Sequence, residues 1–171
     1  MINNVRAKIL AIDPGTKNMG VAFLDNGALL YSGVKVIRNR RSPHEIIQTC
    51  RKIILRLIKD YQPQMLVVEK TFFANNRNSA LLNVLFDEIM NIAKRKKLPI
   101  ICFAPSTMKK AICGNGLATK EDVARVVIAR YPELKVYLTQ DRKWKAAFHY
   151  NMFDAVALGI MLAGRKSRKK P

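Results

Sequence analysis

Acidic residues are scarce in this chain. The 171 residues include 12 Asp and Glu against 31 Lys and Arg, which leaves a formal net charge of +19. Many of the cations stand in runs, at residues 38–41, 94–97 and 165–170. An excess of this size, gathered in this way, favours a polyanionic partner, and the phosphate backbone of a nucleic acid is the first expectation.

Cysteines and long apolar runs are scarce as well. Cys50, Cys102 and Cys113 stand far apart without a second Cys or a His at ligand spacing, so we expect reduced core residues rather than a zinc site or a disulfide framework. No stretch approaches the 18 apolar residues of a membrane helix, and no leader with a cleavage site precedes Asp13. We therefore expect a cytoplasmic protein with no membrane partner.

Internal repeats, low-complexity linkers and signs of a second domain are also missing. The length suits about one domain, and 49% hydrophobic residues are enough to build a core. We expect a single domain over residues 1–164 and a basic tail over residues 165–171.

The N-terminal third has the pattern of an antiparallel meander. Apolar runs at residues 6–12, 19–25 and 28–37 are expected to be strands. Asp25-Asn26-Gly27 between the second and third runs is a strong hairpin signal.

Further along the chain, strands and helices alternate, which indicates parallel strands. Ser42, Pro43 and Glu45 have the spacing of a capping box with Pro at the first helical position. The expected elements are helices over 43–60, 79–97, 119–131 and 152–163, strands over 65–69 and 99–103, and a basic loop over 138–148. The sequence thus predicts an α/β fold, in which a mixed sheet (a three-strand antiparallel meander plus two parallel strands) is flanked by helices.

Three acids occupy places where they could meet. Asp13 ends the first apolar run, Glu69 ends the strand that closes at residue 69, and Asp154 lies on the last helix. Either strand-end acid alone could be a simple strand terminus, and an Asp-x-Gly-Thr start also occurs in actin-like ATPases, but this chain is too short for their second lobe. The joint occurrence favours an oxygen-rich pocket of the kind that Mg²⁺ prefers.

With Asp154 included, the chain resembles a known family, the RuvC-type Holliday junction resolvases. The resemblance covers nearly the whole chain. It is carried by Asp13-Pro14-Gly15-Thr16, Val67-Val68-Glu69-Lys70-Thr71-Phe72-Phe73, Asn78-Ser79-Ala80-Leu81, the 109–120 stretch around Ile112-Cys113-Gly114-Asn115-Gly116, and Asp154-Ala155-Val156-Ala157.

The resemblance implies a ribonuclease H-like fold, a homodimer, and paired symmetric nicks in a four-way DNA junction. It also implies that Asp13, Glu69 and Asp154 are catalytic and hold Mg²⁺, with Mn²⁺ as a substitute and two ions per site, as in other phosphodiester hydrolysis. A branch-migration helicase is a further partner that the family allows.

One position departs from the family pattern. Three residues before the last Asp the family has an acid or a His, and here Asn151 stands there. Asn151 could give its carbonyl oxygen to the metal, or could only cap the final helix. His149 is an alternative ligand or proton shuttle, or else a surface His that stacks near DNA.

DNA contacts are expected on two segments. Phe72 holds the family position of a residue that stacks on bases at the junction centre, although one of the two adjacent rings could belong to the core. Lys109 and Lys120 match positions that contact phosphate, but could also be ordinary solvated lysines. The full set of expected DNA-binding residues is Phe72, Phe73, Asn76, Arg77, Lys109, Lys110 and Lys120.

Other functions remain open at this point. A YqgF-like RNA nuclease shares the hairpin and the fold, although the Glu69-to-Phe72 spacing and the lysine pair favour the resolvase. Asn151 leaves room for a junction-binding protein that cleaves weakly. Trp144, flanked by Arg142, Lys143 and Lys145, could either lie on DNA or anchor its loop to the core.

Overall fold

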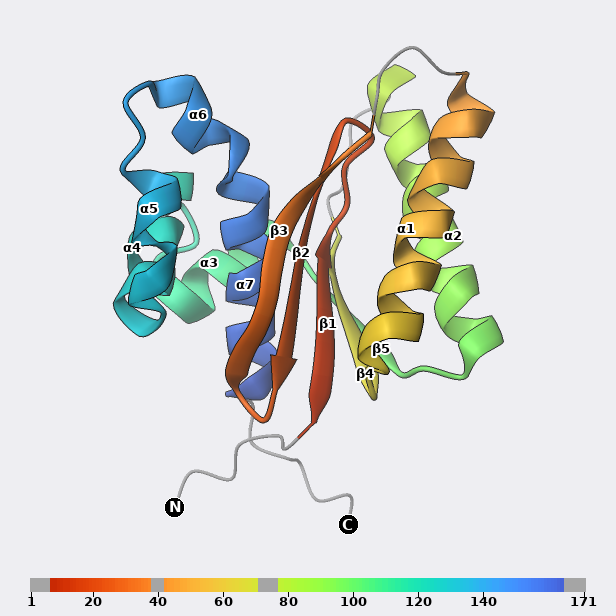
Figure 1. Cartoon of the computed structure of the whole chain (residues 1–171), viewed down its shortest axis with the longest axis horizontal. Coiled ribbons are helices and arrows are strands. Elements are labelled where there is room, and N and C mark those ends of the chain that lie inside the picture. The colour runs from red at the N-terminus through yellow and green to blue at the C-terminus, as the bar shows by residue number, and fades with distance from the viewer. Residues whose placement is uncertain (1–6, 38–41, 71–76, 165–171) are drawn as a thin grey trace.

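A five-stranded mixed sheet forms the centre of the molecule (Figure 1). The structure is a computed structural model, and it describes residues 7–37, 42–70 and 77–164. The strand order is β3-β2-β1-β4-β5, with β1 (Lys8–Asp13), β2 (Asn18–Asp25) and β3 (Ala28–Val36) antiparallel, and β4 (Met65–Glu69) and β5 (Ile100–Phe103) parallel to β1. The predicted fold class is therefore confirmed.

The turn between β2 and β3 is a tight hairpin. Asp25 pairs with Ala28, and the two residues between them, Asn26 and Gly27, have φ angles of 49° and 84°. Positive φ at both positions matches the right-handed twist of the flanking strands, and Asn-Gly adopts it at little steric cost. The predicted hairpin is confirmed.

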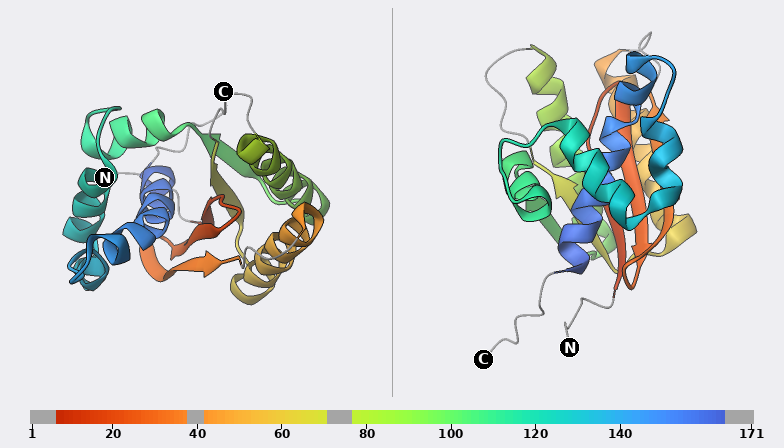
Figure 2. Two further views of the ribbon diagram at one scale, coloured as in Figure 1. Left: turned by 90° about the horizontal axis from the view of Figure 1, so that it is seen from above. Right: turned by 90° about the vertical axis from the view of Figure 1, so that its left-hand side faces the viewer.

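Helices cover both faces of the sheet (Figures 1 and 2). On one face lie α1 (Pro43–Tyr61) and α2 (Arg77–Lys96), and on the other lies α7 (Tyr150–Ala163) with α3 (Pro105–Cys113) and α4 (Lys120–Arg130). In β1, Leu10 and Ile12 belong to the core on the α1 side, while Ile9 and Ala11 belong to the core on the α7 side. Since successive side chains point to opposite faces, a strand covered on both must be apolar throughout.

The start of α1 follows the predicted capping box. The Glu45 N–H donates to Ser42 Oγ at 3.3 Å, and the Ser42 N–H donates to the Glu45 carboxylate at 2.9 Å. Two backbone donors that the first helical turn would otherwise leave unpaired are thereby satisfied.

The region before α7 differs from the prediction. Residues 138–148 are not a continuous basic loop, because α5 (Lys135–Leu138) ends there and α6 (Lys143–Phe148) lies within it, after a short 3-10 helix, η1 (Pro132–Leu134). Only Ala146 of α6 is buried, so this helix has too little apolar periodicity to be visible in the sequence. The helix α3, to which the pattern assigned no element, is similarly short, with Met108 its only buried residue.

The cysteines are free thiols, as expected. Cys50 is buried in the core on the α1 side, whereas Cys102 and Cys113 are only half-buried. Among the helices of the described residues, none has the length and apolar character needed to cross a membrane.

Candidate active site

The structure brings the three predicted acids to one cavity. Ile12 and Val68 are partners in the parallel pairing of β1 and β4, so the next residues, Asp13 and Glu69, lie at the same edge of the sheet. Asp154 reaches this edge from α7, and the three acids line a cavity of about 330 Å³. All are buried, with exposed fractions of 7% for Asp13, 9% for Glu69 and 4% for Asp154.

The remainder of the cavity wall is mostly apolar, with two lysines and one asparagine. Lys109 from α3 and Lys120 from the first turn of α4 supply its positive charge. The other lining residues are Pro14, Leu82, Pro105, Met108 and Asn151. Sequence reasoning missed Leu82, Pro105 and Met108, because a single apolar residue carries no motif that would distinguish a cavity wall from a core.

Burial and mutual repulsion disfavour the charged form of the acids. Burial raises the pKa of Asp13 well above its ordinary value, and the charges of Glu69 and Asp154 raise it further. Burial, followed by the charge of Asp154, raises the pKa of Glu69 to about 7. Burial also raises the pKa of Asp154, against the opposing charges of Lys120 and Lys109. The positive charge of the two lysines is thus not enough to balance the three acids.

Asp154 has one satisfied and one unsatisfied oxygen. Its Oδ2 lies 3.5 Å from the Lys120 ammonium, while its Oδ1 is buried and has no hydrogen-bond partner. A buried carboxylate oxygen without a partner carries a desolvation penalty, which a cation in the cavity would remove.

The chemical types of these donors suit a divalent cation, although the side chains are not arranged around a metal position. As the side chains stand, no group of three or more His, Cys, Asp or Glu residues within the described ranges lies close enough to hold a metal ion. The features that fit are hard oxygen donors from three buried acids, raised pKa values that a cation would lower, and the unpartnered Oδ1 of Asp154.

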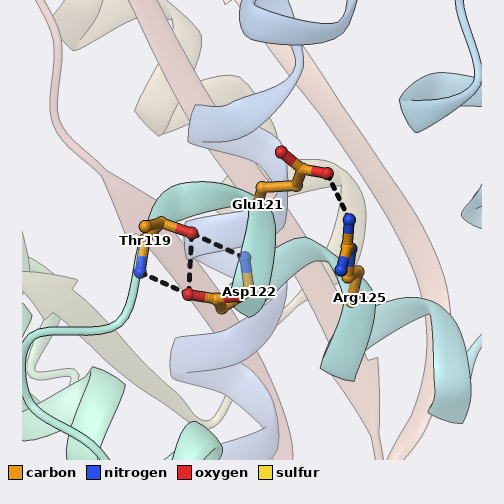
Figure 3. A network of polar contacts seen from close by, with 4 residues as sticks. All are labelled: Thr119, Glu121, Asp122 and Arg125. Carbon is orange, nitrogen blue, oxygen red and sulfur yellow. Dashed lines mark hydrogen bonds and ion pairs between the residues drawn. The ribbon is translucent and has the colours of Figure 1, made fainter.

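The first turn of α4 is held in place by its own capping box, which positions Lys120. The Asp122 N–H donates to Thr119 Oγ1 at 3.1 Å, and the Thr119 N–H donates to Asp122 Oδ2 at 2.8 Å (Figure 3). Arg125 and Glu121 add an ion pair one turn apart on the exposed side of the helix (Figure 3). Lys120 is the first residue of this helix, so the capped turn sets where its side chain leaves the backbone.

Several known proteins resemble this chain in sequence. The sequence model described as "Crossover junction endodeoxyribonuclease RuvC" matches residues 9–160. The chain belongs to the RuvC family. The family member from Hydrogenovibrio crunogenus is 32% identical over 124 residues, covering 70% of this chain and 72% of the relative. The family member from Bacteroides fragilis is 35% identical over 130 residues, covering 72% and 69%.

Solved structures show that the RuvC fold is shared. RuvC of Thermus thermophilus in complex with a Holliday junction substrate has a TM-score of 0.71 at 21% identity, covering 91% of this chain and 92% of that one. The yeast mitochondrial Holliday junction resolvase has a TM-score of 0.64 at 13% identity, covering 93% and 77%.

Asn151, the departure from the RuvC pattern, lines the cavity but does not cap α7. The helix begins at Tyr150 after His149, with no side-chain cap, so the capping alternative is wrong. The Asn151 Nδ2 instead donates to the Asn18 carbonyl at 3.0 Å. Since a carbonyl can only accept, the amide nitrogen must face Asn18, which leaves the Asn151 side-chain oxygen available as an acceptor.

The contact between Asn151 and Asn18 depends on a close approach between the backbones of β2 and α7. A Cβ added to Gly20 of β2 would lie 1.8 Å from the backbone oxygen of Asn151, so only glycine allows β2 to touch the start of α7. The position of Asn151 therefore depends on the strand that carries Asn18.

His149 is placed elsewhere. Its ring packs against Tyr137 at a centroid distance of 4.7 Å and edge-on against Phe148 at 5.0 Å, and burial lowers its pKa. In the part of the chain that the structure describes, it is not among the residues that line the acid cavity. The arrangement therefore gives no support to His149 as a ligand or proton shuttle.

The predicted DNA-binding residues divide into four groups. Lys109 and Lys120 line the cavity, while Lys110 is exposed on α3 and lies off its wall. Arg77 begins α2, and only its backbone is described. Phe72, Phe73 and Asn76 lie outside the described residues.

Proposed function

We propose that this protein resolves Holliday junctions by paired, symmetric nicks made through divalent-metal phosphodiester hydrolysis. Membership of the RuvC family assigns it to the crossover junction endodeoxyribonucleases. The observation that carries the proposal is the cavity in which Asp13, Glu69 and Asp154 are buried together beside Lys109 and Lys120.

The acids are proposed to hold Mg²⁺, or Mn²⁺ in its place, with two ions per site. Asp13, Glu69 and Asp154 would supply charged oxygens, and Asn151 a neutral one. When bound, the ions supply positive charge that lowers the pKa of the attacking water and stabilises the departing oxygen. Because Asn151 adds no charge, we expect weaker metal affinity than an acid at that position would give.

The other residues act on the DNA itself. Lys109 and Lys120 would bind the phosphate to be cut, because their ammonium groups stand on the same wall as the acids. Leu82, Pro105 and Met108 would exclude bulk water from the cavity, which strengthens these contacts. Lys110, Arg77 and Asn76 would contact the phosphate backbone of the DNA, and Phe72, together with Phe73, would insert at the crossover.

A homodimer is part of the proposal. A four-way junction has its own two-fold relation, and a two-fold symmetric dimer presents the same site twice, whereas one protomer would nick only one strand. A branch-migration helicase as a further partner stays a prediction.

A junction-binding protein that cleaves weakly is the second candidate, and the neutral Asn151 is the observation that favours it. The RNA nuclease alternative shares the acids, but membership of the RuvC family favours DNA.

One experiment separates these functions. A four-way junction labelled on each strand in turn, a linear duplex and a structured RNA are incubated with the protein in Mg²⁺, Mn²⁺ or EDTA. Symmetric nicks in two strands of the junction, absent in EDTA, support the proposal. Tight junction binding without nicks supports the second candidate, and preferential RNA cleavage overturns both.

A further inference from the structure

Trp144 is exposed at the surface in a basic setting. Its side chain is 64% exposed on α6, so it does not anchor this segment; the buried residue of α6 is Ala146. Lys145 Nζ lies 6.0 Å from the indole centroid, and Lys143 and Arg142 are exposed beside it. We call Arg142, Lys143, Trp144 and Lys145 the α6 patch. Leaving a large indole in water is unfavourable, so it is a candidate contact surface.

The α6 patch lies close to the active site along the chain and in space. α6 ends at Phe148 and α7 begins at Tyr150, one turn before Asp154. The rise per residue along α6 and α7, with the short link between them, places the Cα of Trp144 within about 20 Å of the Cα of Asp154. In Figure 1 and the right-hand view of Figure 2, α6 lies at the end of the molecule at which α1 and α2 begin. One turn of duplex is about 35 Å long, so a DNA arm with one phosphate at the cavity can also reach α6.

We infer that the α6 patch is a second DNA contact, which holds a duplex arm of the branched substrate beside the active site. The cations would pair with phosphates, and the indole would pack against a sugar or a base edge. Charge supports DNA as the partner, because Asp141 is the sole acid among residues 135–145, against Lys135 and the three cations of the patch. The inference rests on the proposed function, since it assumes a DNA substrate.

The chain offers a direct probe, because Trp144 is its single tryptophan. Wild-type protein in EDTA is titrated with a labelled four-way junction, and junction anisotropy and tryptophan emission are followed together, with acrylamide as a quencher. We expect the emission to change with the same midpoint as the anisotropy, and acrylamide to lose access to the indole at saturation.

Variants measure the contribution of the patch. Trp144→Ala should weaken junction binding by about tenfold, and Trp144→Phe should restore most of it. Leu30→Ala is the matched control, because Leu30 is an exposed apolar residue on β3, with an exposed fraction of 60%. It should leave affinity unchanged.

The cations are tested by salt dependence. Replacing Arg142, Lys143 and Lys145 together by Gln should lower the slope of log affinity against log salt by about 0.9 for each phosphate that the protein no longer neutralises. Replacing Lys94, Lys96 and Lys97 by Gln removes the same charge at the far end of α2, where all three are exposed. An equal fall in both triple variants would mean a general charge effect and would overturn the inference.

Three further outcomes would also count against the inference. Junction binding with unchanged tryptophan emission and unchanged Trp144→Ala affinity overturns the inference but leaves the proposed function standing. No junction binding at all overturns both. Protection of the indole by phosphatidylserine vesicles but not by the junction would assign the α6 patch to a membrane surface instead.

Discussion

Lys120 Nζ lies 3.5 Å from Asp154 Oδ2, on the wall of the cavity in which Asp154 Oδ1 has no partner. The Lys120 side chain is 51% exposed, so the pair adds little to the free energy of unfolding. Its positive charge nevertheless lowers the pKa of Asp13, Glu69 and Asp154. Lys120 is therefore placed to offset the acid charge until cation and phosphate arrive.

Lys120→Ala should slow junction cleavage by at least about tenfold, as expected for the loss of a charged contact to the reacting phosphate. The Mg²⁺ concentration for half-maximal cleavage should not rise, because removing a competing cation leaves the acids freer to bind metal. Nicking rates across a Mg²⁺ titration measure both quantities. Lys52→Ala is the control, because Lys52 is an exposed lysine of α1 that does not line the cavity. Full recovery of Lys120→Ala at high Mg²⁺ would argue against a phosphate contact.

Each of Asp13→Asn, Glu69→Gln and Asp154→Asn should abolish nicking, with a loss of at least about a hundredfold, because each removes a charged oxygen from the metal-binding set. Junction affinity in EDTA should stay the same or rise slightly, since a negative charge near phosphate is removed. Strand-nicking and anisotropy assays on the same preparations test this. Near wild-type cleavage in Mg²⁺ by any one of the three variants would exclude that residue from the site.

The raised pKa of Glu69 predicts a pH dependence of stability in EDTA. Folding raises this pKa from 4.5 to about 7, so the folded protein binds the proton more tightly than the unfolded chain does. Charged Glu69 therefore lowers the free energy of unfolding above about pH 7, and this penalty disappears as the pH falls toward 4.5. Glu69→Gln should be more stable than wild type at pH 8, by an amount on the order of 1 kcal/mol, and the gap should close on acidification. Thermal melts at several pH values measure the difference in stability between Glu69→Gln and wild type. A difference that did not change with pH would contradict the prediction.

Much of the fold was predictable because its signals are local. A few neighbouring residues are enough to predict each of these features. They are the Asn26-Gly27 turn, the capping boxes at Ser42 and Thr119, and β1, which is covered on both faces. The convergence of Asp13 and Glu69 was predictable too, since parallel neighbouring strands end at one edge of the sheet. The reach of Asp154 to that edge followed from the family resemblance.

Features that depend on tertiary contact were not predictable. The helix α6 buries a single residue, Ala146, which leaves no periodic pattern in the sequence. The role of Asn151 depends on the Asn18 carbonyl, which lies 133 residues away along the chain. From sequence alone, an Asn just before an apolar helix resembles a cap, and only the approach of β2 at Gly20 shows that its amide nitrogen is already engaged.

That contact changes what a substitution at Asn151 should do. Asn151→Asp would replace the Nδ2 donor by a carboxylate oxygen facing the Asn18 carbonyl, beside three buried acids. We expect the free energy of unfolding in EDTA to fall by about 1–3 kcal/mol. Mg²⁺ should restore much of this stability, and cleavage should need less Mg²⁺ than in wild type, because the added charge suits a hard cation. Asn151→Ala, which loses the hydrogen bond without adding charge, should cost about 1 kcal/mol and should not gain Mg²⁺ affinity.

The matched control for Asn151→Asp is Asn115→Asp. Asn115 is exposed and uses its Oδ1 to accept from the Leu117 N–H at 2.9 Å, so an Asp there keeps the hydrogen bond while making the same change of charge. Its melting temperature in EDTA and its Mg²⁺ requirement should stay close to wild type. If Asn151→Asp behaved in the same way in both measurements, neither the contact with Asn18 nor a place among the metal ligands could be assigned to Asn151. A loss of stability in EDTA that Mg²⁺ reverses would support both, because only a residue that faces both the Asn18 carbonyl and the cation would respond to both changes.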